Sequence, residues 1–302
     1  MTCRAELARW LTERCTCPFG EARHARDALI AVVYDRCCAP TGGGPSEHLL
    51  AAKYIAVTFL ADDAHDRPPD LEGMVRYLTT GQADDGELVR CFSALVEELM
   101  AQGHDPTRFL RAVQDTITHR LREREVDART VTWDEHWEIR RHTIAVAPYV
   151  WCRSTTRDLD WSETTEDALR ESGVLVLASE AVARANDLAS FPRESLPTPS
   201  LDRPLSLNSV LHYARDLGDL DIAVTTARDA YRTTIDHLRT TLHTLRQVRI
   251  TPAAEQYLEI LTATVNGNLD ALRQMAATRY PGSTRILDGL PTVPTTSKST
   301  PR

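Results

Sequence analysis

The spacing of apolar residues at intervals of three and four positions, repeated along most of the chain, constrains the fold more than any other feature. Such spacing is typical of helices that bury one face, whereas the alternation that marks half-buried strands is rare here. Glycine is also scarce, with 13 residues among 302. The sequence therefore predicts an all-α protein.

Proline- and glycine-rich stretches interrupt this spacing and mark the loops between the predicted helices. The helices are expected at roughly 21–38, 47–64, 86–102, 106–126, 133–152, 164–190, 205–215, 219–248 and 252–279. No linker of different composition divides residues 1–280, so these residues are predicted to form one domain. Residues 281–302 are rich in proline, serine and threonine, and we expect them to form a disordered tail.

Composition and charge exclude several classes of protein. The formal net charge is −8, so no broad basic field is available to bind a nucleic-acid backbone. No stretch approaches the about 18 uncharged apolar residues of a membrane span, and the N-terminus lacks the apolar run of a signal peptide. The odd cysteine count, seven, does not fit a secreted disulfide framework. We therefore predict a cytoplasmic protein, in which an anionic ligand must meet local positive charge or a metal ion.

A cluster of aspartates, D-D-x-x-D, follows the apolar run IAVTFLA near the end of one predicted helix. Asp62 and Asp66 are one helical turn apart and share a face, whereas Asp63 lies about 100° around the helix. Aligned carboxylates at a helix C-terminus repel each other and oppose the helix dipole, which favours a bound cation such as Mg²⁺. Considered alone, the cluster is equally consistent with a solvated acidic helix end.

A second polar column, Asn186, Ser190 and Glu194, continues the face of another apolar helix at intervals of four residues. Its amide, hydroxyl and carboxylate oxygens are again ligands for a hard metal ion. With one negative charge, this group should hold Mg²⁺ firmly only when a phosphate supplies more charge. Pro192 is expected to bend the helix between Ser190 and Glu194. A polar helix end is the alternative, but two such clusters, each after an apolar helix, favour metal binding.

The order of these motifs resembles that of the bacterial class I terpene synthases, or terpene cyclases. That family pairs an aspartate-rich motif with a second motif in which Asn-Asp is followed by Ser and then by a basic residue before Glu. Here the second motif reads NDLASFPRE at 186–194. The family's Arg-Tyr pair after the last core helix is matched by Arg279 and Tyr280, and its diphosphate-sensing arginine by Arg140 or Arg141. The resemblance spans roughly residues 20–280.

The resemblance implies a single-domain helical bundle with a central active-site cavity, three Mg²⁺ ions and a prenyl diphosphate substrate. The residues that it implies for the metal ions are Asp62, Asp66, Asn186, Ser190 and Glu194. Those that it implies for the diphosphate are Arg141, Arg193, Arg279 and Tyr280, with Arg140 as an alternative to Arg141. Among these, Arg141, Arg279 and Tyr280 are the expected catalytic groups. A homodimer is common in the family.

Two departures from the family pattern concern the pocket. The family has a glycine at a helix break four residues after the sensing arginine, and Ala145 stands there if Arg141 is the sensor. The tryptophan that often precedes the Arg-Tyr pair is absent from LDALRQ. Phe59 and either Trp137 or Trp151 are the candidate aromatic side chains of the pocket, although general burial tendencies favour a place in the core for each by roughly two to one.

The predicted reaction is the Mg²⁺-dependent ionisation of a linear C15 or C20 prenyl diphosphate, followed by cyclisation of the carbocation. One alternative is a chain-elongating or head-to-head prenyl diphosphate synthase. Chain elongation typically shows two D-D-x-x-D clusters, and this chain has one. A second alternative is a non-catalytic binding protein on the same fold.

Overall fold

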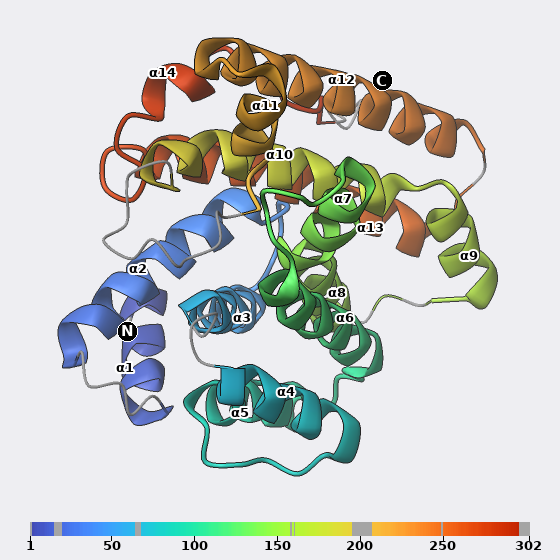
Figure 1. Ribbon diagram of the computed structural model, residues 1–302. Coiled ribbons are helices and arrows are strands. Elements are labelled where there is room, and N and C mark those ends of the chain that lie inside the picture. The colour runs from blue at the N-terminus through green and yellow to red at the C-terminus, as the bar shows by residue number, and fades with distance from the viewer. Residues whose placement is uncertain are drawn as a thin grey trace.

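The computed structural model describes residues 2–14, 20–63, 68–157, 159, 161–194, 207–248 and 250–295, and the regular secondary structure of these ranges is α-helix throughout (Figure 1). The helices are α1 (Cys3–Arg14), α2 (Gly20–Cys38), α3 (Pro45–Asp63), α4 (Pro68–Thr80), α5 (Glu87–Ala101), α6 (Thr107–Glu125), α7 (Trp133–Thr143), α8 (Val146–Thr156), α9 (Glu163–Glu171), α10 (Val174–Glu194), α11 (Ser209–Leu217), α12 (Leu220–Gln247), α13 (Pro252–Met275) and α14 (Thr284–Leu287). The prediction of an all-α, single-domain protein is confirmed.

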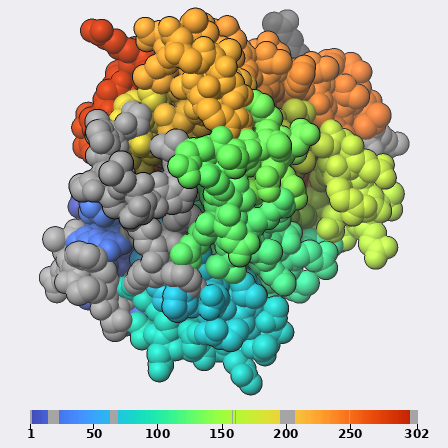
Figure 2. Space-filling view, in the orientation of Figure 1, coloured from blue at the N-terminus to red at the C-terminus, as the bar shows by residue number. Residues whose placement is uncertain are grey.

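The helices enclose two clusters of buried apolar side chains. One cluster is formed mainly by α1 to α6 with part of α8, and the other mainly by α8 and α10 to α14. Helices α4 and α5 lie at the bottom of Figure 1 and α11 and α12 at the top, while α6 and α7 fill the face between them (Figure 2). The aromatic side chains of Tyr34, Phe59 and Trp151 pack against both clusters. They therefore mark the junction between the two halves of the core.

Several helix boundaries differ from the sequence prediction. The helix expected at 133–152 is divided at Ala145, and the one expected at 164–190 is divided near Gly173, whose φ of +67° suits glycine. Helices α1, α4 and α14 were not predicted. The proline pair at 68–69 suggests a loop in the sequence, but it occupies the first turn of α4, where proline is tolerated.

The segment after Tyr280 is not the disordered tail that its composition predicts, as far as residue 295. Leu287, Leu290 and Val293 are buried against α12 and α13. The side-chain amide of Asn266 donates to the Val293 carbonyl and accepts from the Val293 N–H, both at 2.7 Å. A few well-spaced apolar residues and side-chain hydrogen bonds to the backbone thus anchor a segment of low overall hydrophobicity. Residues 296–302 of the predicted tail lie outside the described residues.

Gly267 allows α13 to cross α2 in backbone contact. A Cβ atom at this position would lie 2.1 Å from the carbonyl oxygen of Cys37 and 2.4 Å from the Cα of Cys38. Backbone atoms cannot move aside as a side chain can, so the helices would have to separate.

Gly267→Ala is therefore expected to lower the free energy of unfolding by about 3 kcal/mol, at the upper end of overpacking costs. Urea denaturation measures the effect. Gly44→Ala is the matched control, because a Cβ at Gly44 meets no atom within 4 Å. Equal unfolding free energies for the two variants would contradict the close crossing of α2 and α13.

Candidate active site

The last two turns of α10 bring Ser190 and Glu194 to one hydrogen-bonding partner. The side-chain nitrogen of Asn208, Nδ2, lies 3.2 Å from Ser190 Oγ and 2.8 Å from Glu194 Oε2. Because one amide group reaches both oxygens, the two side chains lie on the same face of the helix. Helix α10 continues through Pro192 to Glu194, so the proline does not turn Glu194 away from Ser190.

The donors on this face fit a hard cation. Within the described part of the chain, the side chain of Asn186 makes no hydrogen bond, and Asn208 engages only one of the two carboxylate oxygens of Glu194. An amide oxygen, a hydroxyl and a carboxylate oxygen therefore remain available to an ion such as Mg²⁺. Among the described residues, no group of three or more His, Cys, Asp and Glu side chains is arranged to hold a metal ion. The candidate site on α10 has one carboxylate, Glu194, and its other two ligands would be the amide of Asn186 and the hydroxyl of Ser190.

Asp62, from the first motif, lies at the C-terminal end of α3. Its Oδ1 accepts from Arg120 Nη1 at 3.1 Å, and 55% of its side-chain surface is exposed. Burial acts to raise the pKa of this carboxyl group, but the charge and hydrogen bond of Arg120, with the charges of Arg279 and Arg140, lower it below its ordinary value. Asp62 is therefore ionised at neutral pH, and its Oδ2 has no hydrogen-bond partner among the described residues. Asp66, its predicted partner, lies outside the described residues.

Arg140 lies between the two motifs. It forms an ion pair with the buried Asp187, the neighbour of Asn186, and its side chain is 12% exposed. Burial acts to lower the pKa of Arg140, but Asp187 and, more weakly, Glu194 raise it above its ordinary value. The same guanidinium stabilises the charged form of Asp62. Arg140 thus pairs with Asp187 of the second motif and also contributes to the positive field at Asp62 of the first.

Arg141, which the sequence favours as the diphosphate sensor, has different surroundings. Its Nε donates to Glu180 Oε1 at 2.7 Å, and its side chain is 38% exposed. Successive residues of a helix point about 100° apart, so only one of the two arginines faces the motifs. The geometry favours Arg140 for the position that the resemblance gives to Arg141.

Arg193, Arg279 and Tyr280 come together on the α13 side of the site. The Arg-Tyr pair does not end the helix but lies in the turn after Met275, where the Arg279 N–H donates to the Met275 carbonyl at 2.9 Å. Arg279 Nε donates to the Tyr280 hydroxyl at 3.1 Å, and the guanidinium of Arg193 lies 5.7 Å from the centre of the Tyr280 ring. Two cations thus flank one phenol.

The expected aromatic side chains differ in their distance from these charges. The ring of Phe59 lies 4.8 Å from the guanidinium of Arg279, and it contacts Tyr34 edge to face at 5.8 Å. Trp137 packs instead beneath the guanidinium of Arg184, 4.0 Å from its ring centre. Trp151 contacts the rings of Trp161 and Tyr257, with ring centres 5.0 and 5.5 Å away. Among the expected aromatic residues, Phe59 is therefore the one beside Arg279, and Tyr34 is in contact with it.

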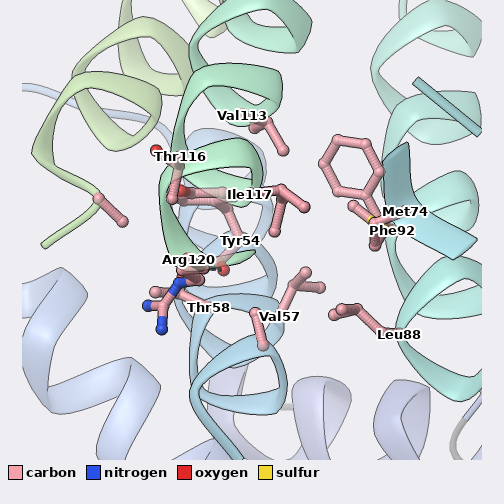
Figure 3. Close-up of a pocket in the computed structure, with 12 residues that line it drawn as sticks. Tyr54, Val57, Thr58, Met74, Leu88, Phe92, Val113, Thr116, Ile117 and Arg120 are labelled. Atoms are coloured by element: carbon pink, nitrogen blue, oxygen red, sulfur yellow. Dashed lines mark hydrogen bonds between the residues drawn. The ribbon is translucent and has the colours of Figure 1, made fainter. Parts of the chain in front are cut away.

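An apolar pocket lies between α3, α5 and α6, and its lining includes Ala61, the neighbour of Asp62 (Figure 3). Val57, Phe92, Ile117, Arg120 and Ala145 are among the residues that line it. It encloses about 20 Å³, roughly the room that one water molecule needs. This pocket is too small to hold a prenyl chain.

Two polar residues of the site were missed in the sequence. Arg120 is one of several arginines in a charged stretch of α6, and nothing in the spacing marks it as the partner of Asp62. Asn208 follows a proline-rich stretch of sequence, and an Asn before a helix indicates only a cap. Both roles depend on contacts between segments far apart in the chain.

A comparison with family models decides between the alternatives. Residues 53–238, more than half of the chain, match the model described as terpene synthase family 2, C-terminal metal binding. The chain belongs to this terpene synthase family. The synthase is therefore a class I terpene synthase, a lyase. Because the matched domain is a metal-binding one, the synthase uses a divalent metal ion.

Solved structures of other terpene synthases share the fold of this synthase. A linalool/nerolidol synthase from Streptomyces clavuligerus, in complex with 2-fluorogeranyl diphosphate, is 22% identical with a TM-score of 0.74, over 90% of this chain and 97% of that one. An α-eudesmol synthase is 18% identical with a TM-score of 0.67, over 90% and 94% of the two chains. No curated protein sequence matches the synthase. None of the helices in the described ranges is long and apolar enough to cross a membrane.

Ala145 forms the break between α7 and α8 of the synthase. Its φ of +61° and ψ of 28° are left-handed, and it is the only described residue other than glycine with a positive φ. A left-handed conformation costs an ordinary residue roughly 1–2 kcal/mol, and such strain often occurs at functional sites. An alanine in a left-handed conformation thus forms the break between α7 and α8.

Ala145→Gly is expected to raise the free energy of unfolding by up to about 1 kcal/mol, because the relief of strain exceeds the added entropy of the unfolded chain. Urea denaturation gives the value. Ala168→Gly, at an exposed position inside α9, should instead lower stability by about 1 kcal/mol. A loss of similar size in both variants would show that Ala145 is unstrained.

Proposed function

We propose that this synthase ionises a linear prenyl diphosphate of 15 or 20 carbons with the help of Mg²⁺ and cyclises the allylic cation to a terpene hydrocarbon or alcohol. The observation that carries the proposal is the position of Arg140, coupled electrostatically to Asp62 and paired with Asp187 beside Asn186. A diphosphate bound there would meet concentrated positive charge, although the protein as a whole carries −8.

The metal ligands proposed for this reaction are the oxygen donors of the two motifs. Asp62, with Asp66, would hold two ions, and Asn186, Ser190 and Glu194 would hold a third. Bound Mg²⁺ supplies Lewis-acid charge that stabilises the leaving diphosphate. The single carboxylate of the second group makes it a weak site until diphosphate oxygens add their charge.

The arginines of the site bind and orient the diphosphate. Arg140, rather than Arg141, is our proposed sensor. Its planar guanidinium is paired with Asp187, and phosphate oxygens of the substrate can replace that carboxylate as its hydrogen-bond acceptors. When Arg140 turns to the substrate, Asp187 keeps a hydrogen bond of 2.9 Å from the backbone N–H of Ser209. Arg193, Arg279 and the Tyr280 hydroxyl approach the same anion from the α13 side.

The carbocation must be kept from water and from its own leaving group for as long as cyclisation takes. The rings of Phe59 and Tyr34 lie next to Arg279, where they can stabilise the cation through their faces as it leaves the diphosphate. The departing diphosphate is the proposed final base, and no protein group is assigned to that step. A homodimer and a cytoplasmic location are also part of the proposal.

Product analysis with geranyl, farnesyl and geranylgeranyl diphosphate and Mg²⁺ tests this function. A cyclic or rearranged C15 or C20 hydrocarbon or alcohol, identified by mass spectrometry, is the expected product. A longer diphosphate from a mixture with isopentenyl diphosphate would instead establish chain elongation. A product from geranyl diphosphate alone would overturn the proposed chain length but not the reaction type.

A further inference from the structure

Asn208 connects the N-terminus of α11 to the end of α10 through both ends of its carboxamide. Its Oδ1 accepts from the backbone N–H of Val210 at 2.9 Å, which caps α11. Its Nδ2 lies 2.8 Å from Glu194 Oε2, 3.2 Å from Ser190 Oγ and 3.0 Å from the Asp187 carbonyl. The side chain is buried, with 2% of the residue exposed. One end therefore serves the helix and the other end serves the second polar motif.

The contact leaves the metal-binding capacity of the motif intact. The two N–H groups of Asn208 Nδ2 face three acceptors, so the contact with Ser190 Oγ, the longest of the three at 3.2 Å, shares an N–H with one of the others. A carboxylate has two oxygens and a hydroxyl oxygen has two lone pairs, so Asn208 uses at most one acceptor position on each. The other oxygen of Glu194 and the second lone pair of Ser190 stay available to an ion. Hydrogen bonds of this kind to ligating groups typically orient them and tune metal affinity.

Glu194 has particular need of such a partner. Its long side chain loses rotamer freedom when it is fixed, and it stands at a helix C-terminus, where the dipole disfavours a carboxylate. Within the described residues, Asn208 is the group that hydrogen-bonds to it. Pro192, two positions earlier, removes one N–H from the backbone ladder of this last turn. Without Asn208, the orientation of Glu194 would be set by the weakest part of the helix.

Helix α11 is itself held firmly, so Asn208 has a fixed base. The guanidinium of Arg215 donates to the carbonyls of Ala128, Arg129 and Val131 at 3.2–3.3 Å. The indole of Trp133 donates to Asp216 at 2.9 Å. These contacts fasten α11 to the loop before α7 and to α7 itself.

We propose that Asn208 is a positioning residue for the second metal-binding motif, in which its amide N–H groups hold Ser190 and Glu194 in the arrangement that an ion requires. This inference rests on the proposed function, because it takes those two residues as metal ligands. Asn208 touches neither the ion nor the substrate. It acts by reducing the ordering that the ligands must undergo when the ion and diphosphate bind.

Two variants separate the capping role of Asn208 from its positioning role. Asn208→Ser keeps a capping oxygen for the Val210 N–H but is too short to reach Glu194, whereas Asn208→Ala loses both contacts. The readout is calorimetric binding of inorganic diphosphate in the presence of Mg²⁺, with the thermal midpoint measured alongside. Both variants should weaken binding by about 10–100-fold, as for lost partners of metal ligands. Only the alanine variant should show a clearly lowered thermal midpoint.

Wild-type affinity in Asn208→Ser, together with weakened binding in Asn208→Ala, would overturn the proposal and leave Asn208 as a cap only. Asn208→Thr, which also keeps a capping hydroxyl, replaces the serine variant if that protein does not fold. Glu194→Ala in the same titration distinguishes the positioning role of Asn208 from the assignment of Glu194 as a metal ligand. Lost binding in Glu194→Ala with unchanged binding in Asn208→Ser would refute the positioning role alone. Unchanged binding in Glu194→Ala would refute the metal assignment, and with it the role of Asn208.

Discussion

Glu194→Ala is expected to lower turnover of the accepted prenyl diphosphate by more than about 100-fold, while the fold stays intact. Loss of a group that only supports a metal ligand costs about 10–100-fold, and this variant removes a proposed ligand itself. Asn186→Ala should have a similar effect, because it removes the amide oxygen of the same group. Both residues are partly exposed on α10, so little packing is lost.

Steady-state turnover and the thermal unfolding midpoint together measure this effect. Glu171→Ala is the matched control, since Glu171 is an exposed carboxylate in the last turn of another helix, α9. That variant should keep the activity of the wild type. Wild-type turnover in both Glu194→Ala and Asn186→Ala would rule out the assignment of the third metal ion to α10.

Arg140→Lys is expected to lower turnover by about 10–100-fold, which corresponds to the 1.5–3 kcal/mol of a charged hydrogen bond. Lysine keeps the charge that pairs with Asp187, so the buried carboxylate is not left alone, but it lacks the fork that binds two phosphate oxygens. Arg141→Lys should change turnover by less than about threefold, because Arg141 pairs with Glu180 and is 38% exposed.

The paired variants form a direct comparison, because the same substitution is made at neighbouring positions of α7. Turnover over a range of diphosphate concentrations separates weaker binding from slower ionisation. A large loss in Arg141→Lys, with normal turnover in Arg140→Lys, would return the role of diphosphate sensor to Arg141.

The long helices could be predicted from the spacing of their apolar residues. Apolar spacing indicated α2, α3, α5, α6, α12 and α13 closely. The break at Ala145 could not be predicted, because alanine favours helix and only the tertiary structure imposes a left-handed conformation on it. The regular structure of residues 281–295 was missed for a similar reason. Contacts with Asn266 and the burial of a few leucines hold this segment in place, although its composition is typical of disorder.

The candidate site shows the same division. The shared face of Ser190 and Glu194 could be predicted, because residues four apart on one helix share a face. The choice between Arg140 and Arg141 depends on the rotation of α7 relative to α3 and α10, and local spacing does not contain this angle. Arg120 and Asn208 reach the motifs from other helices, across 58 and 14 positions of sequence. Their roles follow from packing between helices.

The most direct test of the central claim is the release of inorganic diphosphate from the prenyl diphosphate that the synthase accepts. Release is followed in the presence of Mg²⁺, after removal of the metal with EDTA, and after Mg²⁺ is added back. Metal-dependent ionisation predicts release with Mg²⁺, its loss on chelation, and full recovery on re-addition. Release at an unchanged rate in the presence of EDTA would contradict it.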